Sequence, residues 1–182
     1  MKLQLGVVLG LIALSAVSVA QTPADPIETA LKAAPGRLKD NATVIKWKPD
    51  YTYETLRKGT NRLVCYDRSG QPGQQPFAAE CTSVGNLDRV AQNLKLEAIP
   101  DKKASLAAFD AAEKDGTRVK PEYGSVWYHV NGPDADRTRT HITVAVPGAT
   151  GKSLGLPEDG KQGTLWVMNP GTSTAHLMIP GQ

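Results

Sequence analysis

The hydrophobic pattern of this chain changes its period twice, and that change limits the folds it can adopt. Apolar and polar residues alternate in ATVIKWK, YTYETLR and NRLVCYD, between residues 42 and 67, as expected for strands. From about residue 83 to 116, apolar residues recur every three or four positions, as on one face of a helix. Strand-like segments SVWYHV, RTHITVAV, TLWVM and TAHLMI follow. Strands grouped apart from helices predict an α+β single domain, a mainly antiparallel sheet of about seven strands with two or three helices inserted between strand runs.

Capping signals mark where the helices should begin. Asp25 followed by Pro26 predicts a short helix to about residue 33. A second helix could begin near Ser83, with its apolar face toward the core and polar residues, Arg89 among them, pointing elsewhere. Asp101 is the expected N-cap of a third helix, which should stop at Gly116. The first three strands, between residues 42 and 67, should form a small antiparallel meander.

The first 20 residues, MKLQLGVVLGLIALSAVSVA, predict a secretory signal peptide. Lys2 precedes an apolar run, and the small residues Ser18 and Ala20 occupy the −3 and −1 positions of a cut before Gln21. A membrane anchor would need a longer unbroken apolar stretch. The expected organisation is therefore a signal peptide at 1–20 and one exported domain at 21–182, periplasmic or secreted, without a membrane anchor after cleavage.

The charge of the chain disfavours two classes of partner. The net charge is +3, and the leader contributes only Lys2 to it. Nucleic acids and anionic membranes normally require clustered positive charge. No nucleic-acid partner is expected, and the sequence identifies no other partner.

The two cysteines, Cys65 and Cys81, are expected to form a structural disulfide. Two cysteines in a small exported domain usually pair, and their spacing is not that of a CxxC redox motif. A metal site would need nearby histidines, and none lies between the two cysteines. The SGQPGQQP segment between them is typical of an irregular loop.

The histidines and tryptophans are the candidate site residues. His129, His141 and His176 lie on three different predicted strands, from which a three-histidine metal site could be assembled. They have neither HxH nor HExxH spacing, so local hydrogen bonds on each strand are the favoured interpretation, and no cofactor is expected. Trp47, Trp127 and Trp166 could line an apolar pocket, although tryptophans on strands more often belong to the core.

A serine-based active site is a further alternative. Ser125, His141 and either Asp134 or Asp136 could form a triad only if the fold brings them together. Ser125 lacks the GxSxG context that exposes a nucleophilic serine.

Several short motifs resemble those of a group of uncharacterised exported bacterial proteins. They are GTNRLVC at residues 59–65, a proline-rich gap and a second cysteine, a YHV strand, and AHLMIPG at residues 175–181. The resemblance implies a bacterial origin and no mechanism. The sequence as a whole favours an exported domain with a binding or structural role over catalysis. The alternative is a metal-dependent or serine hydrolase that uses the strand histidines.

Overall fold

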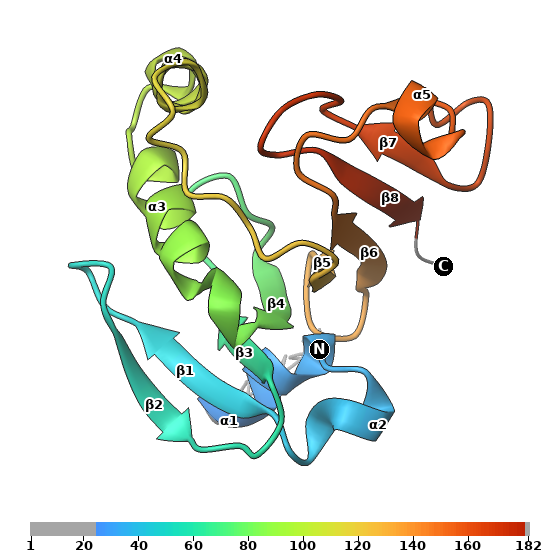
Figure 1. Ribbon diagram of the computed structural model, residues 1–182. Coiled ribbons are helices and arrows are strands. Elements are labelled where there is room, and N and C mark those ends of the chain that lie inside the picture. The colour runs from blue at the N-terminus through green and yellow to red at the C-terminus, as the bar shows by residue number, and fades with distance from the viewer. Residues whose placement is uncertain (1–24, 181–182) are drawn as a thin grey trace, which may run out of the picture.

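A mixed sheet of eight strands runs through the centre of the protein in the computed structural model, which describes residues 25–180 (Figure 1). The strands are β1 (Thr43–Trp47), β2 (Tyr53–Arg57), β3 (Leu63–Asp67), β4 (Phe77–Ser83), β5 (Val126–Gly132), β6 (Arg139–Ala145), β7 (Trp166–Met168) and β8 (His176–Pro180). Their order in the sheet is β2-β1-β3-β4-β5-β6-β8-β7. The α+β class and the single sheet are confirmed.

Two details of the predicted sheet are wrong. Strand β1 pairs in parallel with β3, so residues 43–67 do not form an antiparallel meander; β2 lies at the sheet edge and the chain crosses back from it. Strand β4 was not predicted, because FAAECTS follows the Gly- and Pro-rich loop and has no clear alternation. Both of its faces are covered, and its burial pattern is accordingly almost continuous.

Short helices and two longer ones connect the strands. They are α1 (Pro26–Ala30), the 3₁₀ helix η1 (Leu31–Ala33), α2 (Gly36–Lys39), the 3₁₀ helix η2 (Val84–Asn86), α3 (Leu87–Glu97), α4 (Lys102–Lys114) and α5 (Gly151–Leu154). The side chain of Asp25 accepts a hydrogen bond from the Ile27 amide, and Asp101 accepts one from the Ala104 amide. Both predicted N-caps are confirmed.

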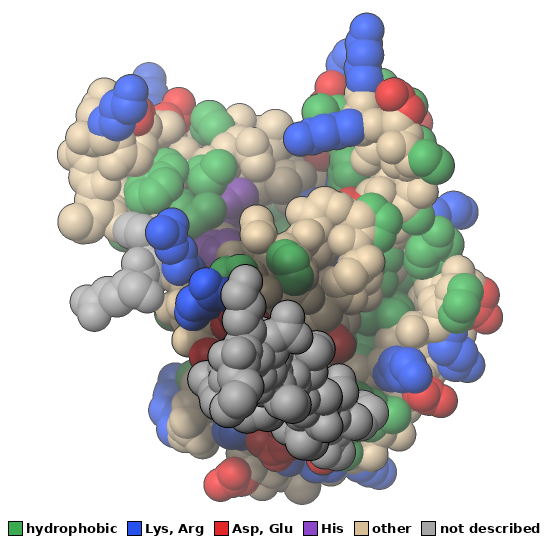
Figure 2. Space-filling model, turned by 180° about the vertical axis from the view of Figure 1, so that it is seen from behind, with side chains coloured by type: hydrophobic (Ala, Val, Ile, Leu, Met, Phe, Trp, Pro, Cys, Tyr) green, Lys and Arg blue, Asp and Glu red, His purple; other side chains and the backbone are tan. Residues whose placement is uncertain are grey.

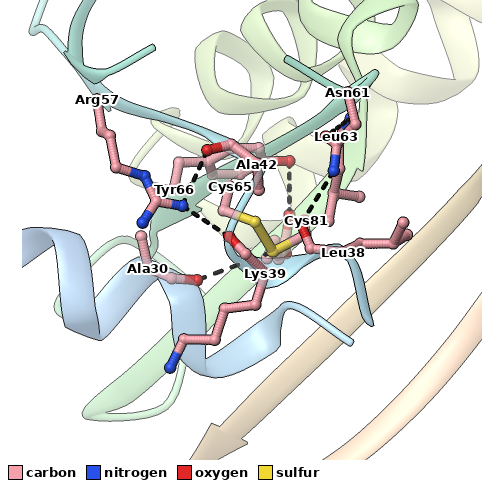
Figure 3. Close-up of a disulfide and its surroundings, with 11 residues drawn as sticks. Ala30, Leu38, Lys39, Ala42, Arg57, Asn61, Leu63, Cys65, Tyr66 and Cys81 are labelled. Atoms are coloured by element: carbon pink, nitrogen blue, oxygen red, sulfur yellow. Dashed lines mark hydrogen bonds between the residues drawn. A yellow bond between two sulfur atoms is a disulfide. The ribbon is translucent and has the colours of Figure 1, made fainter. Parts of the chain in front are cut away.

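The N-terminal helices cover the sheet face that carries the disulfide. Cys65 and Cys81 lie directly opposite each other on β3 and β4, are fully buried, and are bonded as predicted. Figure 3 shows the bond beneath the chain around Ala30, with Cys81 Sγ 3.8 Å from the Ala30 carbonyl oxygen. Nearby, Arg57 of β2 donates a hydrogen bond to the carbonyl of Lys39 and so ties the N-terminal helices to the edge of the sheet.

Helix α3 covers the opposite face. Its apolar residues Leu87, Val90 and Leu94 pack on Ile45, Val64 and Tyr66 of the sheet. One prediction for this helix is wrong: Arg89 is only 4% exposed, because the loops at 119 and 173–174 close over it.

The predicted signal peptide lies outside the described residues. Among residues 25–180, no helix is long and apolar enough to cross a membrane.

Candidate functional site

The three histidines lie on neighbouring strands and on one face of the sheet. His129 of β5 and His141 of β6 are directly opposite each other, and their rings stack with centroids 4.3 Å apart and planes 7° from parallel. His176 of β8 lies opposite Ala145, four residues beyond His141 along β6. Four residues of strand span about 13 Å, so the stacked pair lies at one end of this part of the sheet face and His176 lies at the other.

These residues line a single cavity of about 250 Å³. Its walls come from the sheet, from α3 and from the segments around residues 121 and 174: Arg89, Asn93, Pro121, Trp127, His129, His141, Thr143, Ala145, Thr174, Ala175, His176 and Met178. Figure 2 shows histidine side chains at the bottom of a recess in the surface. A second hollow, lined by α4 and residues 169–174, shares Arg89, Asn93 and Thr174 with it. The sheet histidines therefore form the floor of a concave surface.

The geometry does not form the metal site considered from the sequence. Among residues 25–180, no group of three or more His, Cys, Asp or Glu side chains could hold a metal ion. The rings of His129 and His141 stack on each other, and His176 lies opposite Ala145, four residues along β6 from His141.

A buried carboxylate holds His129 in place. Glu80 lies opposite His129 in the sheet, and its Oε1 is 3.4 Å from His129 Nδ1. Because a carboxylate accepts, this contact places a hydrogen on Nδ1 of His129. Tyr66 donates a 3.1 Å hydrogen bond to Glu80, and Arg68 pairs with Glu80 at 3.3 Å.

The partners of Glu80 keep it ionised. Burial acts to raise its pKa, but the hydrogen bond from His129 and the positive charge of Arg68 outweigh burial and hold the pKa at about 2. Arg68 also pairs with Glu97 at 2.5 Å, where burial raises the pKa of Glu97. A chain of charged contacts thus links Glu97 of α3, Arg68, Glu80 and His129 across one face of the sheet to the cavity floor.

The other two histidines are held in the neutral form. Burial, and then the charge of neighbouring His129, lower the pKa of His141 to about 4. Burial also lowers the pKa of His176. Nδ1 of His176 is 2.8 Å from the Thr174 carbonyl oxygen, which can only accept, so Nδ1 carries the hydrogen and Nε2 is an acceptor.

Arg89 is the charged residue of the cavity wall. Its guanidinium donates to the Val119 carbonyl, to Ser173 Oγ at 3.3 Å and to Thr174 Oγ1 at 2.8 Å, all neutral oxygens. In residues 25–180, no carboxylate oxygen lies within 4.0 Å of it. Burial, and then the positive charge of Arg118, lower the pKa of Arg89 to about 10, so it remains charged at neutral pH.

Other sequence candidates lie elsewhere. Of the three tryptophans only Trp127 lines this cavity; Trp47 packs edge-on against Tyr53 and Tyr66 in the core, and Trp166 of β7 lies against the backbone at residue 160. The three do not line one pocket, because they lie on different parts of the sheet.

The residues considered for a serine triad have other partners. Ser125 is buried, donates to the Glu122 carbonyl and accepts from Asn86. Asp134 is bound to Arg137 in the exposed β5–β6 turn. None of the hydrogen bonds among the described residues joins Ser125, His141 and an aspartate.

Sequence reasoning missed the two charged residues that define the site, Glu80 and Arg89. Glu80 interrupts the apolar run FAAECTS, and a lone acid inside a buried strand is a signal that it has a polar partner. Arg89 has no such signal, since it occupies an ordinary polar position of an amphipathic helix.

Comparison of this chain with known proteins identified no related protein. No protein-family model matches the chain, and no curated protein or solved structure matches it.

Proposed function

We propose that this protein is an exported binding domain whose site is the histidine-lined cavity between β5, β6, β8 and α3. One observation carries the proposal: three half-buried histidines and the buried charge of Arg89 face the same concavity. Ligand sites are typically concave and mostly apolar, with a few convergent polar groups. Trp127, Ala145 and Met178 supply the apolar part here.

The cavity has unused hydrogen-bonding capacity. Nδ1 of His176 faces the Thr174 carbonyl, so this neutral ring has an Nε2 acceptor left, and neither ring nitrogen of His141 has a hydrogen-bond partner among the described residues. These rings stand on paired strands and not on free loops, which fixes their positions before any ligand arrives. Pre-formed polar groups reduce the ordering cost of binding, and this supports a recognition role.

Export is the second part of the proposal. The leader at 1–20 supports it, and the buried Cys65–Cys81 disulfide is compatible with an oxidising compartment, periplasmic or extracellular. The resemblance of its short motifs to those of exported bacterial proteins supports a bacterial origin. The test is peptide mass spectrometry of the protein expressed with its own leader in a Gram-negative host. A periplasmic form beginning at Gln21 is expected, and an intact Met1 in the membrane fraction would contradict export.

Binding is tested with a chemically mixed panel of small molecules in ligand-observed NMR. The panel should include sugars, amino acids, organic acids and neutral aromatics. Some member is expected to bind, and His141→Ala and His176→Ala should each weaken it at least fivefold. Tyr53→Ala, on the far edge strand β2, is the control and should leave binding unchanged. Absence of any hit, or hits insensitive to both histidine variants, would refute a site in this cavity.

Hydrolysis is the second candidate function, favoured by the Glu80–His129 contact. A carboxylate that orients an imidazole and leaves Nε2 free is the usual arrangement of a general base. Turnover of 4-nitrophenyl esters that His129→Ala removes, and that Tyr53→Ala retains, would favour this candidate. Equal rates in wild type and His129→Ala would exclude the dyad as its source.

A further inference from the structure

We propose that the cavity binds a small organic carboxylate, whose carboxylate pairs with Arg89 and whose far end donates a hydrogen bond to the stacked imidazoles. This inference rests on the proposed binding function and names its ligand class. It follows from three features of the cavity: a buried positive charge at one end, a pair of stacked imidazoles at the other, and an apolar wall between them.

The positive charge of Arg89 lacks a carboxylate partner within the part of the chain described. Buried charges are normally paired with an opposite charge. A guanidinium has five N–H groups, and the contacts to residues 119, 173 and 174 use three of them. Glu113 accepts hydrogen bonds from the backbone amide of Ser173, at 2.6 Å, and from its hydroxyl, and the charge of Glu113 acts on Arg89 from beyond the 4.0 Å of an ion pair. Two N–H groups therefore remain for a ligand, and two N–H groups match the two oxygens of a carboxylate.

The neighbouring arginine does not compete for the same ligand. Arg118 is also buried, and its two terminal nitrogens donate to Gln92 and Asn93 while its guanidinium lies 4.8 Å from the centre of the Phe109 ring. Its charge adds to the positive potential behind Arg89 without lining the histidine cavity. An anion at Arg89 would gain from both charges.

The two ends of the cavity are set apart by the sheet register. Arg89 is bound to Thr174, two residues before His176, so its guanidinium belongs to the His176 end. The stacked pair of His129 and His141 lies about 13 Å away along β6. Trp127, Thr143 and Met178 line the cavity between the ends. A ligand with a carboxylate, an apolar or aromatic body and a terminal hydroxyl matches this order.

The same polarity disfavours inorganic phosphate. A phosphate dianion needs more donors than the two remaining N–H groups of Arg89, and at that end of the cavity the Nδ1–H of His176 is already bound to the Thr174 carbonyl. His141 and His176 are both held neutral at pH 7 by their burial. A monoanion with a donor at its other end fits this site better.

The test uses three matched probes and calorimetry at pH 7.5 with the full mature protein. 3-(4-Hydroxyphenyl)propionate carries the carboxylate, the aromatic body and the hydroxyl; its amide lacks the charge, and 3-phenylpropionate lacks the hydroxyl. The hydroxy acid is expected to bind, the amide at least tenfold more weakly and 3-phenylpropionate about threefold more weakly. Because this comparison uses wild-type protein, it does not depend on the folding of any variant.

A pair of arginine variants locates the charge. Arg89→Met should reduce affinity for the hydroxy acid at least tenfold and make acid and amide equal. Arg137→Met is the matched control in the exposed β5–β6 turn and should leave both affinities unchanged. Equal binding of acid and amide to wild type, or displacement of the hydroxy acid by 1 mM inorganic phosphate, would overturn the inference. If the mixed panel yields only neutral ligands at the histidines, carboxylate recognition fails while the binding function stands.

Discussion

The depressed pKa of His141 makes a quantitative prediction about acid stability. Its pKa is about 4 in the folded protein, against an ordinary value of 6.5. Between these values the unfolded chain takes up a proton that the folded chain does not, so stability falls as pH falls from 6.5 to 4. The full difference corresponds to about 3 kcal/mol. Because the ring retains some exposure to solvent, we expect about 2 kcal/mol from this residue.

The substitution His141→Phe isolates that contribution. Phenylalanine keeps a flat ring against His129 and removes the titrating group, so the variant should lose about 2 kcal/mol less stability between pH 7 and pH 4 than wild type. Urea unfolding followed by circular dichroism at pH 7, 6, 5 and 4 measures the difference. Glu80 of the folded protein remains ionised throughout this range, since its pKa is about 2. Its contribution to the pH dependence is the same in both proteins and cancels in their difference. Identical pH dependence in the two proteins would refute the assignment of a buried neutral imidazole to His141.

Two other perturbations probe the fold. Replacing both Cys65 and Cys81 with alanine should cost about 3 kcal/mol of unfolding free energy in urea titrations, because the bridge restricts the unfolded chain; a loss under 1 kcal/mol would contradict this. Gly59→Ala would place a Cβ 2.3 Å from the Asn41 carbonyl oxygen, and should lower stability by at least about 2 kcal/mol. Gly36→Ala meets nothing within 4 Å and should be neutral or slightly stabilising, so equal effects of the two glycine changes would contradict the packing described.

Local signals in the sequence predicted most of the helices and strands, but the order and direction of the strands in the sheet depend on pairing between residues far apart in the chain. The caps at Asp25 and Asp101 act within one helical turn, so they could be identified without the fold. The parallel pairing of β1 with β3 depends on how residues 58–62 cross the sheet, which no period-2 pattern encodes. Strand β4 was missed for a related reason, since burial on both faces removes the alternation that marks a strand.

The site was predictable only in part. The sequence singled out His129, His141 and His176 as residues of three different strands. It could not show that β8 pairs with β6, which is what places His176 in line with His141. Nor could it show that Arg89 turns inward, because its partners at residues 119, 173 and 174 are 30 to 85 positions away along the chain.

The most direct test of the account follows the imidazole rings themselves. With ¹³C-labelled histidine, the protein gives three ring signals, one for each of His129, His141 and His176. Titration with any ligand found in the mixed panel should shift all three signals along one common binding curve, because the rings line one cavity. A ligand that binds the protein with a defined affinity and leaves all three ring signals unmoved would contradict the claim that this cavity is the functional site.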